Sequence, residues 1–163
     1  MEPQNQIQTV DRSAIVKMVR DMNEGDQFSM LVTGTSMMPF LFDRKSVVYL
    51  EKCTQYKGKK GDIILFFRLD GSVVLHRVRD TSDPLQIMVN GDAQEWTENI
   101  FPMQVMARVT AIQRRKRVFS VENKWYRFWV AVWRPLLPLH PAGARLVHIW
   151  HRIPEKIFGI HKK

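Results

Sequence analysis

Three residue types that together can activate a nucleophile occur in order along this chain. A serine, Ser36, follows a glycine and precedes two methionines and a proline in the stretch "TGTSMMPFLF". The first histidine, His76, lies in "VLHRV", and acidic residues follow it in "NGDAQEWTE". A serine hydroxyl becomes nucleophilic when an imidazole accepts its proton, and a carboxylate that fixes the imidazole tautomer assists this transfer. The order of these residues therefore permits a hydrolytic triad.

Each of these residues also has an ordinary structural explanation. Methionines such as Met37 and Met38 often fill a core, and Pro39 is a common turn residue. A histidine on a strand is more often structural than catalytic, and a serine, a histidine and an acid occur in this order in many domains. The residues alone leave the acid open among Asp92, Glu95 and Glu98.

The elements that must position these residues are mainly strands. Asp11 is a suitable N-cap for a short helix, whose apolar face ends before Gly25. Short runs rich in β-branched residues follow, separated by turn residues, at 46–51, 62–67, 72–78, 85–90 and 103–113. Asp70-Gly71 predicts a hairpin between the second and third of these runs. We therefore expect a mainly β domain with a short N-terminal helix.

Charge divides the chain of 163 residues into two segments. Residues 1–113 carry 13 basic and 14 acidic side chains, whereas residues 114–163 carry 12 basic and two acidic ones. We predict a β domain over 1–113 and a basic, aromatic helical tail over 114–163. Apolar residues recur at helical spacing at 125–133 and 146–153, with basic residues between them. Such a tail predicts docking on an anionic membrane surface, and packing on the β domain is the alternative.

Several features indicate where the protein is found. The first residues lack the basic start and apolar run of a signal or transit peptide, and no apolar run reaches the ~18 residues of a membrane span. A single cysteine, Cys53, excludes an internal disulfide. We expect a cytoplasmic protein whose tail binds peripherally to the inner face of the cell membrane. No metal or cofactor is predicted, because His148 and His151 have no acidic or cysteine partner nearby.

Four stretches together resemble the signal peptidase I and LexA-like serine peptidase superfamily. "GTSMMP" resembles its nucleophile box, "KKGDIILFF" its Gly-Asp strand, "VVLHRV" its base-bearing strand and "VNGDAQEWTE" its Gly-Asp loop. The resemblance spans about residues 31–112, which would form the catalytic core. It implies a β catalytic domain and serine endopeptidase activity that removes a leader or propeptide.

The resemblance also implies roles for single residues. Ser36 matches the nucleophile, and His76 takes the place of the lysine base, as in the endoplasmic-reticulum, archaeal and sporulation-type signal peptidases. The acid of that branch falls at Glu98, six residues after the Gly-Asp aspartate, Asp92. Glu98 is thus the first candidate for orienting His76, and Asp92 is the second. A histidine base predicts activity that rises through roughly pH 6–7.

Residues around the nucleophile are expected to bind substrate and the oxyanion. By resemblance these are Gly34, Thr35, Met37, Met38 and Pro39. Signal peptidases often have a serine at the position of Gly34, so the oxyanion would depend on the Ser36 backbone N–H with help from Thr35. Family pockets favour small residues just before the cut, and an extended peptide would add as a strand beside the site.

Two alternatives within the same fold carry different functions. A LexA-like regulator would have an N-terminal helix-turn-helix and a self-cleavage bond upstream of the serine, and this chain shows neither. The basic run at 114–117 could contact nucleic acid, but so short a run is more often a solvated edge, so a nucleic-acid partner is not favoured. The second alternative is a peptide-binding module that has lost its activity.

Overall fold

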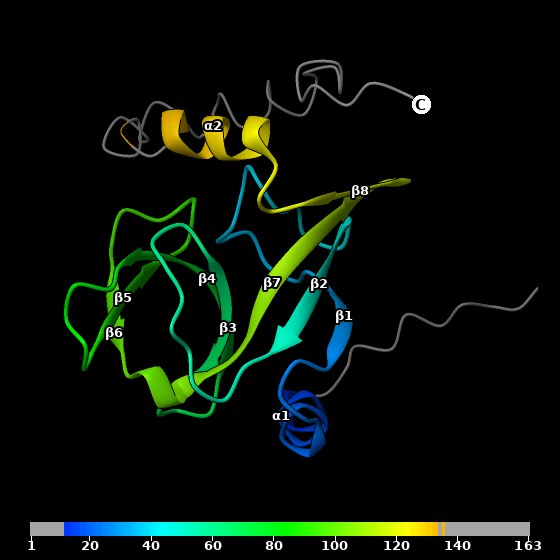
Figure 1. The fold of residues 1–163 in the computed structure, drawn as a ribbon. Coiled ribbons are helices and arrows are strands. Elements are labelled where there is room, and N and C mark those ends of the chain that lie inside the picture. The colour runs from blue at the N-terminus through cyan, green and yellow to red at the C-terminus, as the bar shows by residue number, and fades with distance from the viewer. Residues whose placement is uncertain (1–11, 134, 136–163) are drawn as a thin grey trace, which may run out of the picture.

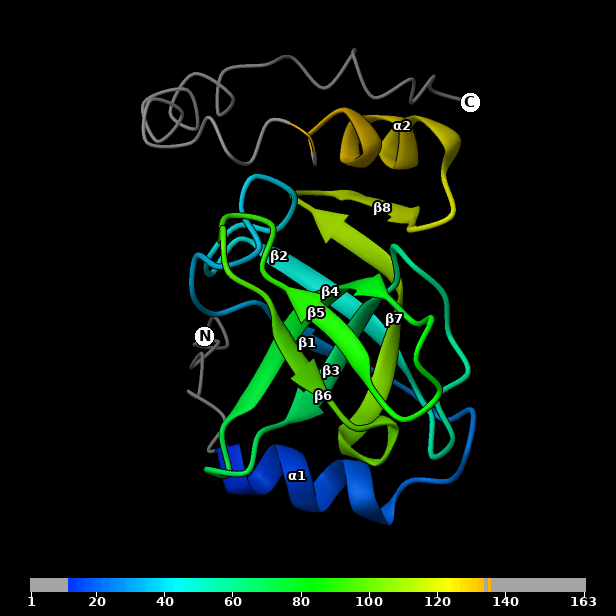
Figure 2. The same ribbon diagram turned by 90° about the vertical axis from the view of Figure 1, so that its left-hand side faces the viewer.

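The computed structural model describes residues 12–133 and 135, which form one mainly β unit (Figures 1 and 2). Eight strands form an antiparallel sheet in the order β1-β2-β7-β3-β4-β5-β6, and β8 pairs with β7. The elements are α1 (Arg12–Asp21), β1 (Gln27–Leu31), β2 (Ser46–Lys52), β3 (Ile63–Phe67), β4 (Val73–Asp80), β5 (Ile87–Asn90), β6 (Glu98–Ile100), η1 (Pro102–Gln104), β7 (Val105–Arg114), β8 (Arg117–Ser120) and α2 (Lys124–Trp133). The prediction of a mainly β fold is confirmed.

All five predicted strands are present, as β2, β3, β4, β5 and β7. The predicted hairpin joins β3 to β4, and Gly71 in its turn has a φ of 80° that favours glycine. Three strands were not predicted, namely β1, β6 and β8. The strands β1 and β6 are the two edges of the sheet, and β6 has only three residues. Neither strand therefore has a long apolar run.

The strand β7 connects two halves of the sheet, as Figure 1 shows. It pairs with β2 on one side and with β3 on the other, and both pairings contain a register shift that bends the sheet. One core cluster includes residues of β2, β7 and α2, and the other includes residues of β3, β4, β5 and β6. The candidate triad residues Ser36, His76 and Glu98 come from the second half and from the turn between β1 and β2.

The first part of the predicted tail belongs to the β unit. The predicted boundary near Arg114 falls at the end of β7, whose hairpin partner is β8. The side chain of Asn123 caps α2 by accepting bonds from the backbone N–H groups of Trp125 (2.9 Å) and Tyr126 (3.1 Å). One side of α2 is then buried against the sheet through Tyr126, Val130 and Trp133.

The opposite flank of α2 carries Trp125, Phe128 and Val132, which are exposed by 53%, 52% and 38%. Packing on the sheet therefore buries only part of the apolar surface of the helix. The predicted N-cap Asp11 and the second predicted tail segment, 146–153, lie outside the described residues, as do His148 and His151. Among the described helices, neither is long and apolar enough to cross a membrane.

Candidate active site

Ser36 lies in a tight turn between β1 and β2. Gly34 enters the turn with a φ of 91°, and its N–H donates to the carboxylate of Asp43 (2.8 Å). The carbonyl of Met37 then accepts bonds from the N–H groups of Phe40 (3.1 Å) and Leu41 (2.9 Å). Backbone hydrogen bonds before and after Ser36 therefore hold its position.

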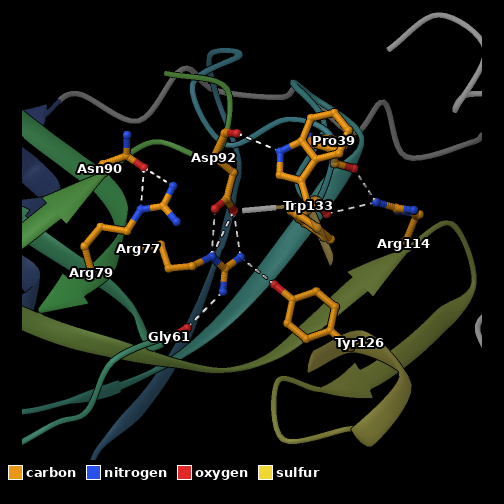
Figure 3. A network of polar contacts seen from close by, with 10 residues as sticks. Pro39, Gly61, Arg77, Arg79, Asn90, Asp92, Arg114, Tyr126 and Trp133 are labelled. Carbon is orange, nitrogen blue, oxygen red and sulfur yellow. Dashed lines mark hydrogen bonds and ion pairs between the residues drawn. The ribbon is translucent and has the colours of Figure 1, made fainter. Parts of the chain in front are cut away.

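The turn residues that were predicted to bind substrate differ in how deeply they are buried. Met37 is only 2% exposed and belongs to the core, and Pro39, which follows a cis peptide bond, is also buried. The guanidinium of Arg114 fixes this end of the turn by donating to the carbonyl of Pro39 (3.1 Å; Figure 3). Thr35 is exposed and Met38 is half-buried. The side chains of Met37 and Pro39 therefore anchor the turn, while Thr35 and Met38 reach the surface.

The loop between β5 and β6 closes against Ser36. The N–H of Ala93 donates to the Ser36 carbonyl (2.8 Å), and a Cβ placed on Gly91 would come within 2.6 Å of the same oxygen. Only glycine permits so close an approach at position 91. The side-chain amide of Asn90 donates to the carbonyls of Gln94 (2.6 Å) and Trp96 (2.9 Å) and so ties the loop together.

His76 and Glu98 meet across this half of the sheet. His76 lies on β4, is 1% exposed, and its Nδ1 is 2.9 Å from Oε1 of Glu98, the first residue of β6. A carboxylate can only accept hydrogen bonds, so the proton of the neutral imidazole lies on Nδ1. The lone pair of Nε2 is then the one that can accept a proton, as a general base requires.

Burial and charge set the protonation of this pair. Burial is the main cause that lowers the pKa of His76 below its ordinary 6.5, with a smaller contribution from Arg68, against the opposing charge of Glu98. Burial raises the pKa of Glu98, but the hydrogen bonds and charge of Arg68, followed by those of His76, outweigh it, so the pKa of Glu98 is lowered. Glu98 is thus ionised and His76 is neutral at neutral pH.

Arg68 was not among the residues predicted from the sequence. Its Nε and one terminal nitrogen donate to the two oxygens of Glu98, at 2.8 and 2.7 Å. The guanidinium also lies 5.9 Å from the ring centre of Trp96, and the rings of Trp96 and His76 are arranged edge to face with their centres 6.2 Å apart. The sequence signal was weak, because Arg68 precedes a hairpin turn, where a basic residue is usually solvated.

Asp92, the second candidate acid, pairs with a different residue. Its carboxylate accepts bonds from Nε (2.8 Å) and a terminal nitrogen (2.6 Å) of Arg77, and both side chains are at most 1% exposed (Figure 3). The same guanidinium donates to Tyr126 of α2 (2.9 Å). Burial opposes the charge of Arg77, but Asp92 and Tyr126 outweigh it and raise the pKa of Arg77. Glu98, and not Asp92, is therefore the carboxylate bonded to His76.

A cavity of about 140 Å³ lies beside this second ion pair. It is lined by residues of α2 and of the loop before β3, among them Gly61, Arg77 and Tyr126. The cavity therefore opens on the Arg77 side of β4, away from the contact between His76 and Glu98.

Ser36 and His76, the candidate nucleophile and the candidate base, are not hydrogen-bonded to each other. Within residues 12–133, no bond joins Ser36 Oγ to His76, and the backbone N–H groups of Thr35 and Ser36 donate to no partner. In enzymes without substrate, catalytic hydrogen bonds are often long and tighten in the substrate complex. The two N–H groups remain available to a developing oxyanion, whereas that of Gly34 is bonded to Asp43.

Comparison with models of known protein families and with curated proteins gives no match for this chain. In the described part of the chain, no group of three or more histidine, cysteine or acidic side chains is arranged to hold a metal ion. The geometry around Ser36 and His76 and the resemblance of the four sequence stretches are therefore the basis for a function.

Proposed function

We propose that the protein is a serine endopeptidase of the signal peptidase and LexA-like type that cleaves a leader or propeptide. The observation that carries the proposal is the contact of His76 Nδ1 with Glu98 at 2.9 Å, which leaves Nε2 as the basic nitrogen. In addition, the loop that leads into β6 contacts the backbone of Ser36 through Ala93. The carboxylate of Glu98 is itself held by two further bonds from Arg68, so its position relative to the imidazole is fixed.

In the proposed reaction, His76 Nε2 accepts the proton of Ser36 Oγ as the oxygen attacks the substrate carbonyl carbon. The carbonyl oxygen becomes an oxyanion that accepts bonds from the backbone N–H groups of Ser36 and Thr35. The imidazolium, stabilised by Glu98, gives its proton to the leaving amine, and the C–N bond breaks. Water then hydrolyses the acyl-enzyme with His76 as the base, which restores the serine.

The proposed substrate is a peptide or protein with small residues before the cut, bound in an extended conformation. The edge strands of the sheet provide backbone groups for such a peptide, and extended peptides commonly bind by adding to a sheet edge. Thr35 and Met38 are the turn residues that reach the surface and could contact it.

Peptide hydrolysis tests this function. The wild-type protein is incubated with a library of peptides that vary in the residues before the cut, and the products are identified by mass spectrometry. We expect cleavage after small residues that is lost in Ser36→Ala and kept in the control Ser82→Ala, a change of an exposed residue in the loop between β4 and β5. Cleavage that survives Ser36→Ala would refute the proposal.

We also propose that the exposed flank of α2 holds the peptidase on an anionic membrane surface. Tryptophan, which has an apolar ring and a polar N–H, favours the membrane interface, and Trp125 is about half exposed. Phe128, also about half exposed, adds apolar area beside it. The segment 114–163 has 12 basic and two acidic residues, which complements an anionic leaflet. The active unit would thus be cytoplasmic and peripherally bound to the membrane.

Co-sedimentation of the full chain with phosphatidylcholine vesicles, with and without phosphatidylserine, tests this docking. We expect binding that needs phosphatidylserine, weakens at high salt, and decreases in Trp125→Ser/Phe128→Ser. Met103→Ser, which removes an 80% exposed side chain far from α2 in the sequence, serves as the control. Equal binding of the double variant and the wild type would exclude α2 as the contact.

A further inference from the structure

The structure gives Glu98 a second partner that a serine-histidine-acid mechanism does not require. The Arg68 guanidinium binds both carboxylate oxygens, and Oε1 is shared between Arg68 and His76 Nδ1. A two-point bond from a planar guanidinium fixes the plane of a carboxylate, which a single bond cannot do. The direction in which Glu98 meets the imidazole is therefore set by Arg68.

Arg68 is itself held in place. Its backbone N–H donates to the carbonyl of Ser72 (2.8 Å), and its carbonyl accepts the N–H of Gly71 (2.9 Å), so the β3–β4 hairpin fixes its Cα. The ring of Trp96 flanks the guanidinium, and the carbonyl of Trp96 is bonded by Asn90. Side-chain exposure decreases inward along the series, from 32% for Arg68 through 19% for Glu98 to 2% for His76.

We propose that Arg68 is a positioning residue that orients Glu98 and thereby fixes the tautomer and the basicity of His76. This inference rests on the proposed function for its effect on catalysis, but not for its effect on the imidazole. The charged groups that influence His76 are Glu98, Arg68 and Asp92, and those that influence Arg68 are Glu98 and Asp70. Among them, Arg68 alone is positive, so it alone lowers the proton affinity of His76 by its charge.

The tautomer of His76 can be measured without any substrate. Imidazole ¹⁵N shifts of the full-length protein are followed with pH, and the His76 signals are assigned by their loss in His76→Gln. We expect a single Nδ1–H tautomer in the wild type. In Arg68→Gln, a mixture of tautomers and a higher pKa of His76 are expected, because the two-point bond to Glu98 and the positive charge of Arg68 are both lost. Arg68→Lys keeps the charge but not the two-point bond, so its tautomers mix while the pKa stays closer to that of the wild type.

Activity provides the second readout. In Arg68→Gln, kcat is expected to fall by on the order of 10-fold to 100-fold, the range that misplaced catalytic groups commonly cost. The pH at which activity rises is also expected to be higher in this variant. In Glu98→Gln it is expected to be lower, because the negative charge that favours protonated His76 is lost. Arg108→Gln is the matched control, since Arg108 pairs with Glu51 on another part of the sheet.

The two proposals fail in different ways. Cleavage that does not depend on Ser36 would overturn the peptidase function, whereas the His76 shifts would still report on Arg68. Wild-type tautomer and pKa in a folded Arg68→Gln, with kcat equal to that of Arg108→Gln, would overturn the positioning role. If Arg68→Gln does not fold, the same comparison is made with Arg68→Lys, for which an unchanged tautomer would overturn it.

Discussion

Two neighbouring residues of β4, His76 and Arg77, are almost fully buried, and each contacts one carboxylate. His76 meets Glu98, whose other partner Arg68 is about one third exposed, so this cluster extends to the surface. Arg77 meets Asp92 and Tyr126 in the interior, where the indole of Trp133 donates to the Asp92 carbonyl (2.9 Å; Figure 3). Successive side chains of a strand face opposite sides, so the two clusters are separated by the strand itself.

The two clusters differ in how completely their polar groups are bonded. The Arg77 cluster joins α2, β4 and the β5–β6 loop, and every charge in it is neutralised by a bonded partner. The His76 cluster leaves one basic nitrogen without a partner within the described residues. Because the loop of Asp92 also contacts Ser36 through Ala93, the buried cluster supports the position of the candidate nucleophile.

The largest expected effect is the loss of activity when the His76 cluster is changed and the Arg77 cluster is left intact. His76→Gln preserves much of the buried volume but cannot accept the serine proton at neutral pH, so kcat should fall on the order of 10⁴-fold. The free energy of unfolding, measured in urea, should change far less than in a variant of the Arg77 pair. A His76→Gln variant with near wild-type kcat would show that the base lies elsewhere.

The second effect is on stability. Asp92→Asn leaves the buried charge of Arg77 without its partner, and breaking such pairs typically costs about 3–5 kcal/mol. Urea unfolding of the single variants Asp92→Asn and Arg77→Met and of the double variant measures the coupling. We expect the double variant to recover part of the loss, because no unpaired charge remains. Strictly additive losses would contradict the account of a structural ion pair.

Exchange of Glu98, the candidate orienting acid, is expected to have a smaller effect. Glu98→Gln should lower kcat by on the order of 10²-fold, because the tautomer of His76 is no longer fixed by a carboxylate. Its stability should remain closer to that of the wild type, since Glu98 is partly exposed and Asp92 is not. Asp92→Asn in its folded form should keep more activity than Glu98→Gln, and the reverse order would transfer the orienting role to Asp92.

The smallest expected effect is a shift in the pH at which activity rises. Because burial lowers the pKa of His76 and the neutral imidazole is the active form in the proposed mechanism, activity should rise with pH below 6.5 and then level off. The sequence alone predicts a rise through roughly pH 6–7, around an unperturbed histidine, so burial moves the expected rise to lower pH. A profile of kcat/KM against pH locates the rise, and a rise at the alkaline values of a lysine base would contradict the role of His76.

Much of this arrangement could be predicted from local sequence. The strands around His76 and the hairpin at Gly71 have long β-branched runs and a strong turn signal, so their positions follow from the residues. The edge strands β1 and β6 are stabilised by their pairing partners rather than by their own residues, and this depends on contacts distant in the sequence. The pairing of β8 with β7 was obscured by the basic run 114–117, which contains their turn.

The candidate site was predictable only in part for a similar reason. Ser36, His76 and the two acids are visible as residue types, but the choice between Glu98 and Asp92 depends on which face of β4 each acid meets. Arg68 is a further case, because its hydrogen bonds to Glu98 join residues 30 positions apart. Such partners depend on the register of β3, β4 and β6, which the sequence pattern does not specify.

Covalent labelling of Ser36 is the most direct test of a nucleophilic serine activated by His76. The protein is treated with a serine-directed warhead on a short peptide with small residues before the cut, and the adduct is located by mass spectrometry. We expect an adduct on Ser36 that forms much more slowly in His76→Gln and at nearly the wild-type rate in the control Arg108→Gln. An adduct on another residue, or labelling of Ser36 at the same rate without His76, would contradict it.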